Sequence, residues 1–96
     1  METESAIVFD TETTGTNPSE DRIVELSIQF GIGEHAEIKT RRINPQVLIP
    51  PKATAIHGIS DSDVKDCPRF TELASGIRKI FDSARIIVGY NVQFDI

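Results

Sequence analysis

The sequence predicts a mixed α/β domain, in which three antiparallel strands are followed by an amphipathic helix and a fourth strand. Polar and apolar residues alternate over 23–30, apolar residues recur at helical spacing over 71–82, and short turn-forming segments join the first three strands. The helical connection before the last strand predicts that this strand runs parallel to another strand of the sheet. This order of elements, with carboxylates at strand ends, indicates an α+β or α/β domain with a mixed sheet.

The composition is that of one small globular domain. The chain has 96 residues, of which 39% are hydrophobic and 26% charged, and its net charge is −5. This balance disfavours a protein that coats DNA through a basic face, but it does not argue against an enzyme that holds one phosphodiester through metal ions, and composition alone leaves that choice open. No apolar run is long enough to span a membrane, and the acidic start of the chain is unlike a signal peptide. The lone Cys67 is expected to be structural and fits a reducing cytoplasm.

The first predicted strand starts at the apolar residues 6–8 and leads into the segment 9–15, FDTETTG. Side chains alternate across a strand, so Asp10 and Glu12 are expected on the same face, roughly 6 to 7 Å apart. Two carboxylates on a mostly buried strand repel each other, and a shared proton, a basic partner or a cation such as Mg²⁺ relieves the repulsion. The spacing alone also fits a solvated strand face or a salt-bridged pair. Thr13, Thr14 and Gly15 are expected to turn the chain, and Gly15 lets the backbone approach a ligand closely.

The next segments predict a hairpin. Residues 23–30 form the second strand, the glycine-containing segment 31–35 forms the turn, and residues 36–43 form the third strand. His35 lies at the tip of the hairpin and is expected to be solvated. Three basic residues of the chain could contact phosphates, but a solvated position is favoured for each of them. The three basic residues considered for phosphate contact are Arg41, Arg42 and Lys52.

A long connection over 44–60 is predicted to lack regular structure, and it contains His57. Ser60 and Asp63 then resemble the capping box of a short helix that ends near Cys67. The amphipathic helix over 71–82 presents an apolar stripe that we expect to pack in the core. The stripe consists of Phe70, Leu73, Ala74, Ile77, Ile80 and Phe81. The last strand is expected over 85–88, and another helix is expected to begin after it.

Two segments together carry a resemblance to a known family. With the segment 9–15 and the segment 89–95, GYNVQFD, both present, the chain resembles the DEDD (DnaQ-like) superfamily of 3′→5′ exonucleases, which includes the proofreading exonucleases of bacterial DNA polymerase III. The resemblance extends from Ile7 to Ile96. A third block, His57-Gly58-Ile59 with Pro68 and Phe70 behind it, lies between the other two in the expected order.

This resemblance implies a ribonuclease H-like fold and hydrolysis of the 3′-terminal phosphodiester of DNA with two divalent ions, Mg²⁺ or Mn²⁺. It implies that Asp10 bridges both ions, that Glu12 binds one of them, and that Asp95 helps to hold the other. A pocket for the terminal nucleotide is implied as well. Its residues would be Thr13, Thr14, Gly15, His57, Asn91 and Phe94. For His57, substrate contact is favoured over a purely structural role.

The chain departs from the family pattern at two points. Tyr90 stands where relatives commonly carry histidine, a position that binds no metal. The third motif, which supplies a fourth carboxylate and the general base, does not occur in the sequence, so residues 1–96 are expected to be the N-terminal portion of a single exonuclease domain. The alternatives are an inactive domain that binds nucleic acid or a polymerase partner, and an exoribonuclease of the same fold. Uncovered apolar surface also predicts self-association of this chain.

Overall fold

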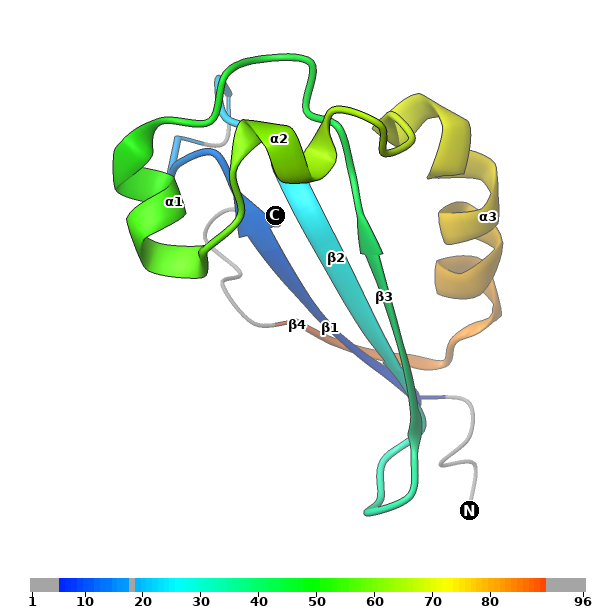
Figure 1. The fold of residues 1–96 in the computed structure, drawn as a ribbon. Helices are drawn as coiled ribbons and strands as arrows, with labels where there is room; N and C mark the ends of the chain where they lie inside the picture. Colours follow the sequence, from blue (N-terminus) through cyan, green and yellow to red (C-terminus); the bar gives the residue numbers. More distant parts are fainter. Residues whose placement is uncertain (1–5, 18, 90–96) are drawn as a thin grey trace.

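The computed structural model describes residues 6–17 and 19–89, which form one mixed sheet and the helices that pack on it (Figure 1). The strands lie in the order β3-β2-β1-β4. β1 pairs with β2 in the antiparallel sense and with β4 in the parallel sense, and β3 forms an antiparallel edge beside β2. The elements in chain order are β1 (Ala6–Thr13), β2 (Ile23–Phe30), β3 (Glu37–Arg42), α1 (Pro51–His57), α2 (Asp61–Val64), α3 (Phe70–Ser83) and β4 (Ile86–Gly89).

The predicted fold class is confirmed, including the parallel pairing of the last strand. β2 has the predicted bounds, because the alternation that marks it also determines which side chains are buried. β3 is one residue shorter at each end than predicted, α3 is one residue longer at each end, and β4 begins and ends one residue later. β1 continues through the acidic pair to Thr13, so the turn begins one residue later than expected. The helix predicted after residue 89 lies outside the described residues.

The core lies against one face of the sheet. Val24, Leu26 and Ile28 alternate along β2 and are buried, so they all point to the same side, which we call the apolar face. Val24 packs in one cluster with residues of α1 and α2, whereas Leu26 and Ile28 belong to a second cluster, against which the apolar side chains of α3 pack. Figure 1 shows α1 and α2 grouped at one end of the sheet and α3 apart from them.

The apolar stripe of α3 largely packs as predicted. Leu73, Ile77, Ile80 and Phe81 all contact the second cluster, and the Phe81 ring meets the Phe9 ring edge-on, with centroids 5.2 Å apart. Phe70, at the start of the helix, is exposed instead. The packing of the stripe against the core therefore begins one turn into the helix.

The prediction that residues 44–60 lack regular structure is wrong, because they contain α1. Pro51 occupies the first turn, where its missing N–H removes no helical hydrogen bond. Gly58 ends the helix in the left-handed conformation, with φ 77°, and donates its N–H to the Thr54 carbonyl at 2.7 Å. His57 is therefore the last residue of a helix, and its direction is determined by the helix end.

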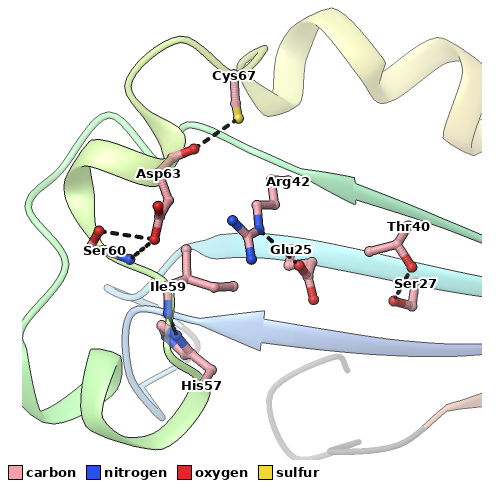
Figure 2. A network of polar contacts seen from close by, with 9 residues as sticks. All are labelled: Glu25, Ser27, Thr40, Arg42, His57, Ile59, Ser60, Asp63 and Cys67. Atoms are coloured by element: carbon pink, nitrogen blue, oxygen red, sulfur yellow. Dashed lines mark hydrogen bonds and ion pairs between the residues drawn. The ribbon is translucent and has the colours of Figure 1, made fainter.

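The predicted capping interaction at Ser60 is present at the start of α2. The Ser60 backbone N–H and the Ser60 hydroxyl both donate to Asp63 Oδ2, at 2.9 and 3.0 Å (Figure 2). These hydrogen bonds hold the pKa of Asp63 below its ordinary value of 3.8. The Cys67 thiol contacts the Asp63 carbonyl at 3.5 Å and packs against the first cluster, in keeping with the structural role expected of it.

Apolar side chains remain uncovered on β4. Ile86, Ile87 and Val88 are 50%, 47% and 42% exposed, and they alternate between the two faces of an edge strand. Surface of this kind favours contact with another chain or segment. Among the described helices, none has the length and apolar character needed to cross a membrane.

Candidate active site

The acidic pair of β1 lies on the face of the sheet opposite the core. Strand pairing places Asp10 opposite Ser27 and Glu12 opposite Glu25. The pairing of β2 with β3 continues both rows across the sheet, to Thr40 and Arg42. We call the face that carries these six residues the polar face. Asp10 and Glu12 thus share one face, as the alternation along a strand predicts.

Two polar contacts join β2 to β3 on this face. Arg42 Nε lies 3.2 Å from Glu25 Oε2, and the hydroxyls of Ser27 and Thr40 lie 2.9 Å apart. Figure 2 shows the two pairs at successive positions along the strands. Glu25 is therefore the third carboxylate of the polar face, and its charge is balanced by a half-exposed arginine.

The electrostatics around Glu12 disfavour its charge. Partial burial raises the pKa of the Glu12 carboxyl, and the carboxylates of Asp10 and Glu25 raise it further, while His57 acts in the opposite direction. A carboxylate in this position is stabilised by a nearby cation. The polar face therefore offers two oxygen-bearing side chains whose repulsion a divalent ion would relieve.

The described residues do not by themselves form a complete metal site. Over residues 6–17 and 19–89, no three His, Cys, Asp or Glu side chains come together in a way that could hold a metal ion. Asp10 and Glu12 nevertheless fit Mg²⁺ or Mn²⁺, because such ions are commonly bound by one or two carboxylates together with water and phosphate oxygens. Asp95, the third predicted ligand, lies outside the described residues, as do Asn91 and Phe94.

The turn after β1 is held by a compact hydrogen-bond network. The Thr14 hydroxyl donates to Asp21 Oδ1 and accepts the Arg22 backbone N–H, both at 2.9 Å. The other Asp21 oxygen accepts the Asn17 N–H at 2.9 Å. A Cβ on Gly15 would lie against the Asp21 carboxylate, 2.7 Å from its Cγ. A side chain at position 15 would therefore displace Asp21 from the hydrogen bonds that hold the turn.

His57 ties α1 to the end of β1. Its Nδ1 accepts the Ile59 backbone N–H at 3.1 Å (Figure 2), so its Nε2 carries the hydrogen and donates to the Thr13 carbonyl at 3.0 Å. Both ring nitrogens are thus bonded to backbone groups 44 and 2 residues away in the sequence. The substrate contact predicted for His57 stays a prediction, and the structure adds a positioning role for the residue.

Sequence reasoning missed the part that Glu25 and Arg42 play. The alternation over 23–30 predicts only a polar position at residue 25, and a solvated face is favoured for Arg42. The ion pair between them and the position of Glu25 opposite Glu12 follow from the register of three strands.

Comparison with known proteins decides the family. Residues 7–96 match the exonuclease family RNase_T. The chain belongs to this exonuclease family. The resemblance drawn from the two acidic segments is thereby confirmed.

Two relatives show how much of a longer protein the chain matches. It is 38% identical over 90 residues to the DNA polymerase III subunit epsilon of Treponema pallidum, covering 92% of this chain and 41% of that protein. It is 35% identical over 94 residues to a DNA polymerase III subunit epsilon-like protein of Rhodobacter capsulatus, covering 94% of this chain and 13% of that protein. The chain thus spans less than half the length of these relatives.

Solved structures of exonucleases share the fold. A product-bound structure of exonuclease I has a TM-score of 0.79 and 26% identity, covering 94% of this chain and 23% of that one. Exonuclease X in complex with 5′-overhanging duplex DNA has a TM-score of 0.75 and 26% identity, covering 94% of this chain and 51% of that one. The predicted ribonuclease H-like, exonuclease-type fold is confirmed.

Proposed function

We propose that this chain is the N-terminal portion of a 3′→5′ exonuclease domain that hydrolyses the terminal phosphodiester of DNA and releases nucleoside monophosphates. The observation that carries the proposal is the Asp10–Glu12 pair, held on the polar face of β1 in a chain of the exonuclease family. Relatives named as DNA polymerase III epsilon subunits support a proofreading role beside a polymerase. The lone free cysteine fits work in the cytoplasm.

Asp10, Glu12 and Asp95 would hold two divalent ions, Mg²⁺ or Mn²⁺. Bound in such a site, the ions supply an activated water and stabilise the leaving 3′ oxygen. Asp10 and Glu12 would orient the ions relative to the scissile phosphate, since both carboxylates project from one strand whose backbone is paired with β2 at these positions. The Glu25–Arg42 pair would limit the negative charge that surrounds Glu12.

The turn at Thr13–Gly15 would receive the terminal nucleotide. Asp21 and Arg22 bind the Thr14 hydroxyl, so this threonine shapes the turn. The hydrogen bond from His57 to the Thr13 carbonyl fixes the entry to the turn from the other side. Asn91 and Phe94 would complete the pocket.

The proposal is tested with a 5′-labelled single-stranded DNA oligonucleotide, Mg²⁺ or Mn²⁺, and the longest natural protein that contains this chain. We expect a ladder that shortens from the 3′ end, and we expect Asp10→Ala to slow it by at least roughly 100-fold, because a metal ligand is lost. The matched control is Asp66→Ala, since Asp66 is exposed and has no hydrogen bond or ion pair with another described residue.

Other results would point to the alternatives. Cleavage of an RNA oligonucleotide in preference to DNA would make the protein an exoribonuclease of the same fold. Tight DNA binding without cleavage, unchanged in Asp10→Ala, would indicate a non-cleaving binding domain. Shortening from the 5′ end would contradict the proposed direction.

We further expect the 96-residue chain to self-associate through β4. Ile86, Ile87 and Val88 are exposed, and the outer edge of β4 pairs with no other strand of the described residues, so β4 offers apolar surface and backbone groups to a second copy. Light scattering should show species larger than a monomer, and Ile87→Lys should shift the population toward the monomer. A monodisperse monomer at high protein concentration would contradict this expectation.

A further inference from the structure

A groove of about 260 Å³ lies between α3 and the β2–β3 side of the sheet. Leu26 and Ile28 from β2 and Ile77 and Ile80 from α3 form its apolar walls, with Lys39 and Arg41 of β3 at its side. β3 is an edge strand, so the groove can be approached along the open side of the sheet. None of the residues assigned to the carboxylate site lines it.

The two cations of the groove belong to the apolar face. Lys39 lies opposite Ile28 and Arg41 opposite Leu26, whereas Arg42 lies opposite Glu25 on the polar face. The Lys39 ammonium lies 5.8 Å from the centroid of the Phe30 ring, and among the described residues neither Lys39 nor Arg41 has an acidic partner. Two positive charges without such a partner, beside an apolar surface, are unusual in a chain with a net charge of −5.

Gly76 keeps the groove open on the side of α3. It lies in the interior of a 14-residue helix, where glycine is destabilising relative to alanine. A Cβ added to Gly76 would meet nothing within 4 Å, so no packing contact of the protein requires glycine there. Because Gly76 lines the groove, a side chain at this position would take up space inside it.

We propose that this groove binds an acidic peptide segment of a partner protein, with apolar side chains between the walls and carboxylates beside Lys39 and Arg41. The charge of the two cations and the apolar walls together match such a segment. A nucleic-acid strand fits less well, because the walls are apolar and the groove is on the face turned away from Asp10 and Glu12. This binding site is independent of the proposed exonuclease activity.

The probe is a fluorescein-labelled ten-residue peptide in which aspartates alternate with leucine and phenylalanine, followed by fluorescence anisotropy at moderate salt. We expect the double variant Lys39→Glu/Arg41→Glu to weaken binding by at least roughly tenfold. Gly76→Leu should weaken it to a similar extent by filling the groove, while leaving the melting temperature unchanged or higher. Lys52→Glu, which reverses an exposed charge on α1, should change the affinity by less than about twofold.

Two control peptides separate the contribution of charge from that of apolar contact. A peptide with lysines in place of the aspartates tests the charge, and an aspartate-only peptide tests the apolar walls; both should bind at least roughly tenfold more weakly than the probe. The proposal is overturned if the probe does not bind, or if the variants bind it as well as the unaltered protein does. It is also overturned if single-stranded DNA binds the groove more tightly than the probe and loses that binding in the double variant.

Discussion

Replacing Glu12 with glutamine is expected to raise the melting temperature of the metal-free protein while abolishing cation binding and cleavage. Glu12 lies directly opposite Glu25 and beside Asp10, and burial together with these like charges raises its pKa. A like-charge pair directly opposite on two strands is destabilising, so removing one charge should add roughly 0.2 to 1 kcal/mol to the free energy of unfolding. The same change removes a predicted metal ligand.

The pH dependence of this stability gain follows from the direction in which the pKa of Glu12 is shifted. The folded-state pKa of Glu12 lies above its ordinary value of 4.5, so ionisation of this group lowers stability as the pH rises through the folded-state pKa. The advantage of Glu12→Gln should therefore vanish below about pH 4.5 and be complete above the raised pKa.

Thermal unfolding measured with and without Mn²⁺ checks both effects. Mn²⁺ should raise the melting temperature of the unaltered protein and leave that of Glu12→Gln unchanged. Glu34→Gln, at the exposed hairpin turn, serves as the matched control and should alter neither quantity. A lower melting temperature for metal-free Glu12→Gln would show that Glu12 makes a net stabilising contact in the folded state.

Replacing Gly15 with alanine is expected to destabilise the protein by roughly 1 to 3 kcal/mol, the usual range for inserting an atom where no space exists. The added Cβ would lie against the Asp21 carboxylate, which accepts hydrogen bonds from Thr14 and Asn17. The turn would have to shift, and cleavage should fall by at least about tenfold because the predicted nucleotide pocket is displaced.

Urea unfolding of four variants tests this explanation. Gly33→Ala is the matched control, since a Cβ at Gly33 meets nothing within 4 Å, and it should leave stability nearly unchanged. Asp21→Ala alone should be destabilising. It should cost clearly less stability when Gly15→Ala is already present, because removing the Asp21 carboxylate also removes its collision with the new Cβ. Strictly additive effects of the two changes would show that the Asp21 contact is not the cause.

The sequence was most informative where burial follows a simple period. The alternation along β2 yielded its bounds and its buried face, and the helical spacing of Leu73, Ile77 and Ile80 placed α3 on the core. α1 was missed because only Ala53 in it is buried, while its Ile56 is 81% exposed, so seven residues present no apolar stripe. Its boundaries were nevertheless marked by Pro51 and Gly58, which are ordinary start and stop signals.

The candidate site was predictable only within one strand. The shared face of Asp10 and Glu12 follows from local geometry, whereas the partners around them depend on pairing between distant segments. Glu25 reaches its place opposite Glu12 through the register across the turn, which contains an irregularity between Glu12 and Thr13. The link from His57 to Thr13 joins residues 44 positions apart, and no local pattern encodes it.

The position of β1 in the sheet has a consequence for binding. β1 is paired with β2 along its length, including at Asp10 and Glu12, and with β4 over residues 6–9, so the backbone that carries the two carboxylates is ordered before any cation or nucleotide arrives. Ordering a backbone residue costs about 1 to 2 kcal/mol of conformational free energy, and this cost is met when the sheet folds. A ligand at the polar face therefore retains more of its interaction energy as affinity than it would on a flexible loop, where binding itself must order the chain.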